Sequence, residues 1–432
     1  MKKLLLILIA LPMIGFGQGW EQHFGNNLTQ DFGFSFLELN SGFLCIGTSE
    51  SCGTNSNSQG IVSKVDINGN VVWIQNYTDT TSIDLYAGIE TPNNNFLLVG
   101  EKLQQHYLLK IDGNGNKIFE TTFNTAFGLG EGINIFNTTN NNYMIVGHGK
   151  LNDNYAISML EINSSGNLIG NSIYQCDSTI NEINFIRQSD NGKFLFTGEY
   201  NNYPNYNKCS FILSLNPNAT LNWLNSYCDS LSYYESTTVI NTNDGGYAIT
   251  GGKQGNSGNS YSTWDDSGVP HLIKTNSNGI FQWEKTYDLS DTSSMSWALD
   301  VFQTNDNGYI LTGQADDSLF LLKVDSLGME EWKSVYGTSE WDMGVMVKQI
   351  NNSGFVAIGV YELLDCVSGS IILIKTDSNG NVTSTFNIPT PSLSRKLEKV
   401  VDVLGRETKG KTNEPLFYIY DDGTVEKRIV IE

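Results

Sequence analysis

The chain has 432 residues, with 25 Lys+Arg against 46 Asp+Glu and a formal net charge of −21. A hydrophobic content of 39% with 11% aromatic residues is enough to form a core, which excludes a globally disordered chain. The acidity argues against DNA and RNA as partners, because phosphate backbones are bound by clustered Lys and Arg. The 43 Gly and several Asn clusters predict many turns and therefore an all-β protein.

Residues 1–17 have the pattern of a secretory signal peptide. Lys2 and Lys3 form the positive region, an apolar run follows up to Leu11, and Gly15 and Gly17 are the small residues that a signal peptidase recognises. We predict cleavage before Gln18 and export of the mature chain. No later stretch reaches the ~20 apolar residues of a membrane helix, so we expect no transmembrane segment.

Two short sequence patterns, which we call the first and the second mark, recur along residues 18–388. The first is an aromatic residue with a glycine four positions later, and the second is a turn sequence that ends in glycine. The second mark, Lys-Val-Asp-Ile-Asn-Gly in its first copy, places a turn glycine at 69, 115, 166, 279, 328 and 380, with alanine at 219. The smallest spacing is 46 residues (69 to 115) and the largest is 60 (219 to 279), close to the ~50-residue period of some propeller blades. The first mark is an aromatic residue followed four positions later by glycine, in seven copies: Phe43/Gly47, Phe96/Gly100, Tyr143/Gly147, Phe194/Gly198, Tyr247/Gly251, Tyr309/Gly313 and Phe355/Gly359.

Each period contains four short alternating runs, which in the second period are residues 84–90, 96–102, 106–112 and 117–123. Four strands joined by tight turns make one antiparallel sheet, and seven such sheets can bury their faces only by packing against one another. We therefore predict a seven-bladed β-propeller of four-stranded antiparallel blades over 18–388, with an open β-solenoid as the alternative.

Aromatic residues follow the turn glycines at positions 73, 119, 223, 283 and 332, where we expect them to wedge between blades rather than stack on a cofactor. The last copy has Ser384 in place of this aromatic residue, while an unassigned strand, Trp20–Phe24, stands at the mature N-terminus. If this strand completes the last blade, the ring closes and both sheet edges are paired.

The recurring Asp-x-Asn-Gly-Asn sequence, as at Asp66–Asn70, resembles part of a calcium loop. An EF-hand loop also needs Gly at its sixth position and Glu at its twelfth, which are absent here. We interpret these segments as hairpin turns, since Asn and Gly tolerate the left-handed backbone. We therefore predict no cofactor, with weak calcium binding left open. The Asp-x-x-Gly-x-x-x-Trp spacing also resembles the tryptophan-docking repeat of quinoprotein propellers, which implies a blade architecture only.

Six cysteines follow the leader, and in an exported protein they are available for disulfides. From their positions we prefer the pairs Cys45–Cys52 and Cys209–Cys228. The four histidines occur singly, and no zinc, phosphate-loop or nucleophile-elbow motif is present, so a catalytic site would have to be dispersed over several blades.

Loops of variable length gather on one rim of such a propeller, which is where a rigid scaffold usually carries recognition. In the longest loop, 252–273, the candidate binding residues are Tyr261, Trp264, Asp265, Asp266 and His271, a mix suited to stacking on sugars or packing against a peptide. A surface insertion without function is the alternative for this loop.

The composition changes at Pro389, and residues 389–432 break the repeat. They read as one strand followed by a hairpin, and they resemble the type A C-terminal sorting domain of the type IX (Por) secretion system of Bacteroidetes, either in a short form or with strands borrowed from 382–398. The positions that match are Val401, Asp402, Gly405, Arg406, Tyr418, Gly423, Lys427 and Ile429. The resemblance implies export across the outer membrane by the type IX machinery and a place on the cell surface or in the medium. A small cap on the propeller is the alternative for this segment.

The sequence thus predicts an exported propeller that acts as a binding module for an extracellular glycan or protein. The alternative is an extracellular hydrolase or lyase with a dispersed site in the central funnel.

Overall fold

The computed structural model divides the chain into two compact units, Met1–Thr383 and Ser384–Glu432. We describe each unit by itself. The structure describes residues 19–25, 29–51, 57–124, 128–129, 134–138, 141–152, 154–202, 207–229, 232–255, 268–289, 296–337, 341–350, 354–364, 368–382, 397–402, 406–408, 415–420 and 425–429.

Within these residues the larger unit is entirely β, and its strands follow one another in antiparallel sets. The first half of the unit contains β1 (Trp20–Phe24), β2 (Thr29–Leu39), β3 (Gly42–Ser51), β4 (Gln59–Asp66), β5 (Val71–Tyr77), β6 (Ile83–Thr91), β7 (Asn95–Lys102), β8 (Gln105–Ile111), β9 (Lys117–Phe123), β10 (Gly128–Leu129), β11 (Asn134–Asn137), β12 (Tyr143–Leu151), β13 (Asn154–Ile162) and β14 (Leu168–Gln175). The predicted strands of the second period therefore correspond to β6–β9 within one residue or two.

The second half continues the same pattern. It contains β15 (Ile180–Gln188), β16 (Phe194–Asn202), β17 (Asn207–Leu215), β18 (Leu221–Tyr227), β19 (Ser232–Asn241), β20 (Tyr247–Gly255), β21 (Val269–Thr275), β22 (Phe281–Thr286), β23 (Ser296–Gln303), β24 (Tyr309–Ala315), β25 (Ser318–Val324), β26 (Glu330–Tyr336), β27 (Met343–Gln349), β28 (Phe355–Leu364) and β29 (Ser368–Thr376).

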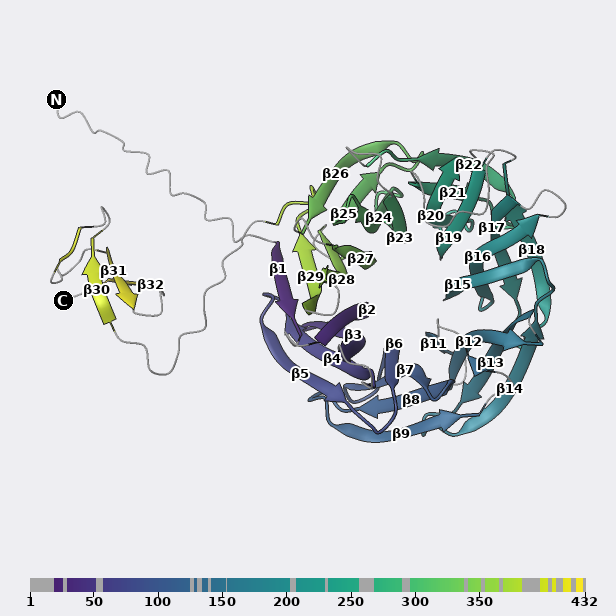
Figure 1. Cartoon of the computed structure of the whole chain (residues 1–432), viewed down its shortest axis with the longest axis horizontal. Coiled ribbons are helices and arrows are strands. Elements are labelled where there is room, and N and C mark those ends of the chain that lie inside the picture. The colour runs from purple at the N-terminus through teal and green to yellow at the C-terminus, as the bar shows by residue number, and fades with distance from the viewer. Residues whose placement is uncertain are drawn as a thin grey trace, which may run out of the picture. The chain divides into compact units, whose positions relative to one another are not determined.

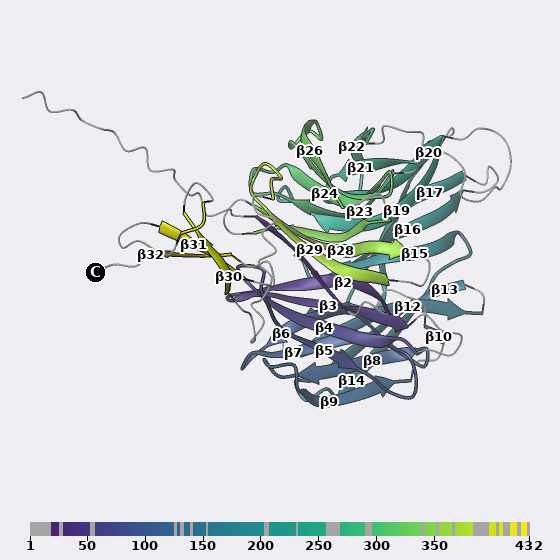
Figure 2. The same ribbon diagram turned by 60° about the vertical axis from the view of Figure 1, so that its left-hand side comes forward.

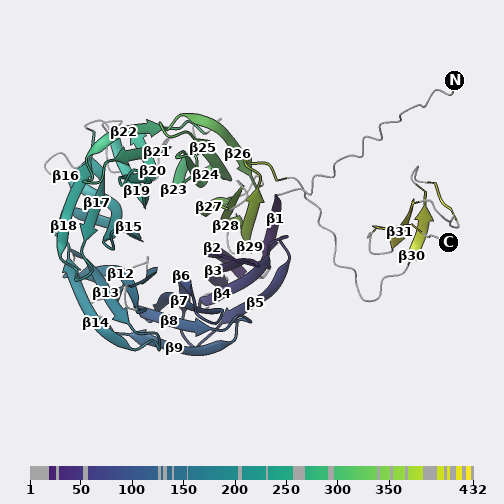
Figure 3. The same cartoon turned by 180° about the vertical axis from the view of Figure 1, so that it is seen from behind.

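The sheets stand radially around a common axis and form a β-propeller (Figure 1). The last strand of each set, such as β5, β9, β14, β18, β22 and β26, runs around the outside of the ring (Figure 3). Apolar side chains of neighbouring sheets pack against each other in separate buried clusters, so the core is distributed around the ring. An open solenoid is excluded by this arrangement.

The predicted closure by the N-terminal strand is confirmed. Strand β1 pairs antiparallel with β29, Trp20 opposite Lys375 and Phe24 opposite Ile371. One parallel bridge, Gln30 to Gly369, also joins β2 to β29, so that β27–β29 and β2–β5 are connected in one eight-stranded sheet (Figure 2). The two ends of the propeller chain therefore meet in the same sheet.

The first sequence mark has a physical explanation in the innermost strands. Six of these strands contain a β-bulge, which pushes a backbone carbonyl toward the neighbouring strand. A Cβ on the repeated glycine would overlap that carbonyl, for example the carbonyl of Phe32 at Gly47 and of Glu235 at Gly251, so no other residue fits. The bulges fall between Gly33/Ser35, Leu85/Ala87, Ile183/Phe185, Ser236/Thr238, Ala298/Asp300 and Gly344/Met346.

The second mark joins each sheet to the next. The wedge prediction is confirmed, because each predicted aromatic ring packs directly on the turn glycine of the following sheet: Trp73 on Gly115, Phe119 on Gly166, Trp223 on Gly279, Trp283 on Gly328 and Trp332 on Gly380. Trp20 of β1 packs in the same way on Gly69, and its Nε1 donates to the Ile67 carbonyl at 3.1 Å. Ring closure therefore repeats the contact that joins the other sheets.

One sheet lacks this aromatic residue, and the turn that follows lacks its glycine. Gly170 stands where β14 should carry the aromatic residue, and the next turn position is Ala219, with φ 58°, in place of glycine. Ala219 is buried in the apolar cluster that contains Met159 and Leu215. A missing ring on one sheet thus coincides with a larger turn residue on the next, because the two positions share one volume.

The hairpin-turn interpretation of the Asp-Asn-Gly segments is also confirmed. Asp66 accepts hydrogen bonds from the backbone N–H of Asn68 (2.9 Å) and Asn70 (2.8 Å) and from the Asn70 side chain (2.9 Å). Asp112 and Asp377 repeat this arrangement. These carboxylates are engaged in holding the turn itself.

One disulfide prediction is correct and the other is wrong. Cys209 and Cys228 form a disulfide with a Cα–Cα distance of 4.8 Å. Cys45 is a free thiol, 1% exposed within the core cluster of β3, and burial raises its pKa to about 12. Its side chain points into the core beside Phe43 and Val65 rather than toward the loop, and Cys52 lies outside the described residues.

The smaller unit is a three-stranded antiparallel sheet of β30 (Leu397–Val401), β31 (Pro415–Tyr420) and β32 (Val425–Ile429). The predicted strand and hairpin are confirmed. Asp402 accepts hydrogen bonds from the Arg406 backbone (3.0 Å) and the Arg406 Nε (2.9 Å), so the Asp-x-x-Gly-Arg segment is closed by its own first and last residues. Val401 and Tyr418 lie in the paired strands, whereas Gly405 and Gly423 are outside the described residues.

Candidate functional site

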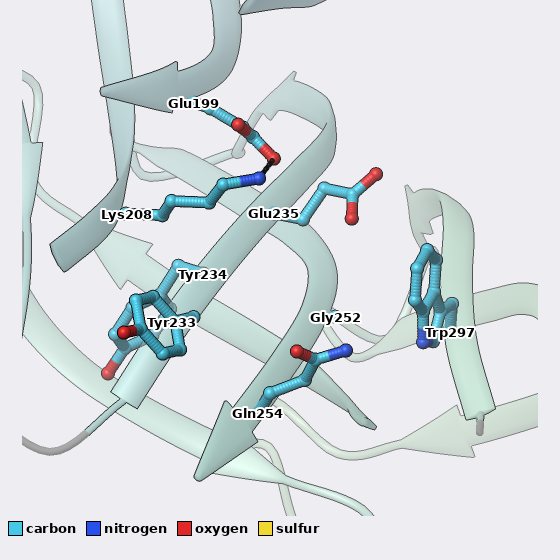
Figure 4. Close-up of a pocket in the computed structure, with 8 residues that line it drawn as sticks. All are labelled: Glu199, Lys208, Tyr233, Tyr234, Glu235, Gly252, Gln254 and Trp297. Atoms are coloured by element: carbon cyan, nitrogen blue, oxygen red, sulfur yellow. Dashed lines mark hydrogen bonds and ion pairs between the residues drawn. The ribbon is translucent and has the colours of Figure 1, made fainter. Parts of the chain in front are cut away.

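A shallow pocket opens on one rim of the propeller, between the sheets β15–β18, β19–β22 and β23–β26, and its space is about 290 Å³ when the part open to solvent is included (Figure 4). Five strands contribute to it, namely β16, β17, β19, β20 and β23. Its described lining consists of charged, amide and aromatic side chains and one glycine: Glu199, Lys208, Tyr233, Tyr234, Glu235, Gly252, Gln254 and Trp297.

The pocket lies on the rim that the sequence predicts for recognition. We call this the crossing rim, because it contains the connections between sheets, such as 78–82, and the connections from the second to the third strand, such as 103–104. The opposite side is the turn rim, which contains the first-to-second and third-to-fourth turns, such as 242–246 and 276–280. The lining residues stand on paired strands, so the ring geometry determines their positions.

An ion pair forms one wall of the pocket. Glu199 of β16 is only 2% exposed and accepts a hydrogen bond from Lys208 of β17 at 2.8 Å. Its second oxygen accepts from the Asn181 side chain at 2.8 Å. The Cys209–Cys228 disulfide follows Lys208 directly in the chain and ties β17 to the segment after β18. The charge of Lys208 is therefore already paired within the protein.

Glu235 lies beside this ion pair, and its carboxylate is in a different environment from that of Glu199 (Figure 4). No hydrogen bond or ion pair to its carboxylate occurs among the residues that the structure describes. Burial, and then repulsion by Glu199 and Glu182, raise the pKa of Glu235 to about 7, although Lys208 opposes the shift. The pocket thus contains a carboxylate that exchanges its proton near neutral pH.

Trp297 of β23 forms the opposite side of the pocket. Its indole lies against two glycines: a Cβ on Gly252 would come within 3.5 Å of the ring, and one on Gly268 within 2.7 Å of Nε1. The buried Nε1 has no hydrogen-bond partner within the described part of the chain. Small residues on both strands flanking segment 256–267 therefore leave room for the ring beside the pocket.

A second charged cluster borders the pocket and is fully paired. Lys253 contacts Glu284 at 3.1 Å and Asp229 at 3.2 Å, and its Nζ lies 4.8 Å from the centre of the Tyr234 ring. Tyr234 in turn donates to Glu284 at 3.2 Å. This network has the same residue types as the pocket but leaves no carboxylate without a cation.

The predicted loop residues have different outcomes. Tyr261, Trp264, Asp265 and Asp266 lie outside the described residues. The prediction that His271 belongs to the loop is wrong, since it lies within β21, 0% exposed, with its ring 5.4 Å from that of Tyr234. Strand pairing extends β20 to Gly255 and starts β21 at Val269, so both ends of the predicted loop 252–273 are strand.

Sequence reasoning missed the pocket itself, because its residues are spread over 199–297 and share no motif. A weak signal was available. Glu235 and Trp297 both occupy the beginning of an innermost strand, shortly after a connection between sheets, where a polar or exposed aromatic residue is out of keeping with a buried strand.

A third group of charges surrounds the axis of the ring, on the innermost strands. Asp300 of β23 is 5% exposed and accepts a hydrogen bond from the Val347 N–H at 2.9 Å. Burial raises its pKa to about 6, opposed by that hydrogen bond and by Arg187. Lys348 of β27 lies 5.4 Å from the Phe36 ring centre. This group contains one engaged carboxylate, so the pocket on the crossing rim is the better candidate site.

The described residues contain neither a cluster of metal-ligating side chains nor a helix that could span a membrane. No group of three or more His, Cys, Asp or Glu side chains has the arrangement of a metal site there. No helix in the same residues is long and apolar enough to cross a membrane.

No protein-family model matches the sequence, and no curated protein matches it. Among solved structures, the polysaccharide lyase Uly1 is similar with a TM-score of 0.50 and 8% identity, over 80% of this chain and 90% of its own. The WD40 domain of Neurospora crassa Pan2 has a TM-score of 0.49 and 10% identity, over 80% and 89%. A protein of unknown function from Bacteroides caccae has a TM-score of 0.40 and 11% identity, over 67% and 93%.

At such low identity a likeness to solved structures concerns the fold alone, and the activity of Uly1 does not transfer to this chain. The radial sheets, the closure by β1 and the likeness to Uly1 agree with one another. The larger unit is a β-propeller.

Proposed function

We propose that this protein is an exported propeller that binds an extracellular saccharide in the pocket on the crossing rim. One observation carries the proposal: Trp297 and Tyr233 line the same pocket as Glu199, Glu235 and Gln254. Aromatic faces pack against the C–H faces of sugar rings, while carboxylates and amides bond the hydroxyl groups.

Binding of the full mature chain to a glycan array tests this proposal. Trp297→Ala removes one aromatic wall, and we expect it to abolish the signal. Phe281→Ala is the matched control, because Phe281 is an aromatic residue of the turn rim that is 52% exposed, and this variant should bind as the native protein does. Absence of any saccharide signal, or full binding by Trp297→Ala, would overturn the proposal.

Segment 256–267, between β20 and β21, gives a second test of the proposed binding function. Deletion of residues 252–273 would remove paired parts of β20 and β21, whereas replacement of 256–267 by a short Gly-Ser linker keeps both strands. We propose that the candidate residues Tyr261, Trp264, Asp265 and Asp266 add to the affinity from this segment. A loss of array signal in a variant with native thermal stability supports their role, and unchanged binding removes it.

An enzymatic function is the second candidate, favoured by one observation. Two pocket carboxylates differ in environment: Glu199 is paired with Lys208 at 2.8 Å, whereas Glu235 has no partner among the described residues and a raised pKa. Pairs of this kind serve as base and acid in glycoside cleavage. Release of new reducing ends or unsaturated products from a polysaccharide panel, lost in Glu235→Gln, would establish a hydrolase or lyase; binding without turnover would exclude it.

We propose further that export follows the type IX route, with residues 1–17 as signal peptide and 389–432 as sorting segment. The resemblance of this segment is supported by its three-stranded sheet and by the Asp402–Arg406 contact at 2.8 Å. In a bacterium with a type IX system, we expect removal of 389–432 to leave the propeller in the periplasm. Surface display or release of the truncated protein would contradict this route.

For the ring we propose seven blades. The repeats number seven, and the eight-stranded sheet divides naturally at its single parallel bridge into β27–β29 with β1 and β2–β5. A crystal structure of the mature chain tests the count.

A further inference from the structure

We infer that the saccharide bound in the pocket carries a protonated amine, and that this amine pairs with Glu235. The inference rests on the proposed function and narrows it to one chemical class, amino sugars with a free amino group.

Charge is unbalanced inside the pocket. Its lining has two carboxylates, Glu199 and Glu235, and one cation, Lys208. Lys208 already pairs with Glu199 at 2.8 Å, so Glu235 is left over. Glu182, which acts on Glu235 by repulsion, increases the negative potential at the site. A cationic ligand would balance this charge, while an anionic ligand would be repelled.

Other charge clusters in the propeller also hold two carboxylates for one lysine, so the pocket differs in that Glu235 lacks an ion-pair partner among the described residues. Lys253 is shared between Asp229 and Glu284 on the same rim, and Lys323 is shared between Asp306 (3.0 Å) and Glu331 (2.8 Å) on the turn rim. In each case the carboxylates have a lysine within ion-pair distance. Glu235 is partly buried and has no hydrogen bond or ion pair to its carboxylate within the described part of the chain, so a ligand or water can pair with it.

The lining distinguishes an amino sugar from a lysine side chain or a peptide N-terminus. A lysine side chain offers one ammonium and an apolar stem, whereas the described lining presents an amide and a second carboxylate beside its aromatic rings. Its remaining walls are the flat rings of Trp297 and Tyr233 and the amide of Gln254, which suit a sugar ring with several hydroxyls.

Calorimetry on the full mature chain tests the inference with two probes that differ in one group. The glucosamine disaccharide carries free amines, and its N-acetylated counterpart does not. At pH 6 we expect the amine form to bind at least tenfold more tightly, with a preference that weakens as salt is raised. At pH 7 its binding should release protons from Glu235, seen as a dependence of the observed heat on the buffer's ionisation enthalpy.

Two variants test whether Glu235 causes this preference for the amine form. We expect Glu235→Gln to bind both disaccharides with similar affinity, while Glu331→Gln, the same change in a carboxylate of the turn rim, keeps the preference. The comparison of the two probes on native protein requires no variant, so it stands even if Glu235→Gln folds poorly.

The outcomes separate the inference from the proposed function. Equal binding of the two disaccharides, or binding of neutral saccharides alone, overturns the amine inference and leaves the saccharide function standing. Binding of lysine-rich peptides without binding of any saccharide overturns both.

Discussion

Two carboxylates, one on each rim of the propeller, lie in opposite environments. On the turn rim Asp244 accepts two hydrogen bonds from Lys274 and others from Thr242 and Gly246; although partial burial opposes the shift, these bonds lower its pKa to about 2. Asp306 and Lys323 repeat the arrangement. On the crossing rim, no described residue donates a hydrogen bond to the Glu235 carboxylate, and its pKa is raised to about 7.

The difference between these two carboxylates indicates which rim stabilises the ring and which rim can bind a ligand. A carboxylate with several donors is a structural part of its turn, and it has no capacity left for a ligand. A partly buried carboxylate without a donor costs stability and is retained only if something outside the protein uses it. The turn rim therefore maintains the ring, and the crossing rim carries the candidate site.

The largest expected effect concerns the turn rim. Gly279 has φ 71°, and a Cβ there would come within 2.7 Å of the Trp223 ring, so Gly279→Ala should lower the free energy of unfolding by about 4 kcal/mol or more. Gly192→Ala is the control, because its φ is 79° but its Cβ would meet nothing within 4 Å, and we expect a loss of about 1 kcal/mol. Urea unfolding measures both. Equal losses would show that the wedge contact contributes little.

The disulfide beneath the pocket has the next largest effect. Replacing Cys209 and Cys228 by Ala opens a loop with a sequence separation of 19, which should cost about 3 kcal/mol. Because Lys208 adjoins Cys209, we also expect weaker ligand binding. Thermal melts with and without reductant check this: the native melting temperature should fall on reduction, and that of the double variant should not change. A Cys176→Ala variant, which alters a buried free thiol, should still respond to reductant.

Glu235→Gln should stabilise the folded protein by about 2 kcal/mol at pH 8. The pKa of Glu235 rises from 4.5 to about 7 on folding, so the folded state binds the proton more tightly than the unfolded state. Stability from this group is therefore full below pH 4.5 and is lost as the pH rises through 7.

Asp244→Asn on the turn rim should behave in the opposite way. The lowered pKa of Asp244 contributes stability above pH 4, which is lost as the pH falls toward 2. Unfolding titrations at pH 4, 6 and 8 distinguish the two variants. A destabilised Glu235→Gln at pH 8 would mean that Glu235 is a structural group and would contradict the contrast between the rims.

The smallest effect concerns His271, which lies behind the bordering network of the pocket. Both ring nitrogens are buried and lack partners among the described residues, and burial lowers the pKa to about 3. His271→Phe should raise stability by about 1 kcal/mol at pH 7. Because unfolding frees the ring to take up a proton, the native protein should lose stability from pH 6.5 down to 3, and the variant should lose less. Identical pH profiles would count against a buried neutral ring.

Prediction from sequence succeeded for features encoded within a few residues. Strands β6–β9, the Asp66 turn and the hairpin of β31 and β32 follow from alternation and turn chemistry, which are local. The closure by Trp20–Phe24 was predictable because one repeat lacked its aromatic residue while a spare copy stood at the other end.

Predictions failed where the direction of a side chain mattered. Cys45 and Cys52 are near in sequence, yet the pleat of β3 turns Cys45 into the core. His271 was assigned to a loop because the ladder between β20 and β21 extends beyond the alternating run, and strand pairing sets that limit.

By itself, the sequence determined the repeated four-stranded unit, the closure of the ring and the turns of one rim, because each depends on a period or on residues in contact along the chain. Only the tertiary structure decided which charged groups meet. The pocket joins Glu199, Glu235 and Trp297 from three consecutive sheets. Their proximity depends on how bulged inner strands pack around the axis, a property of the closed ring that no single repeat contains.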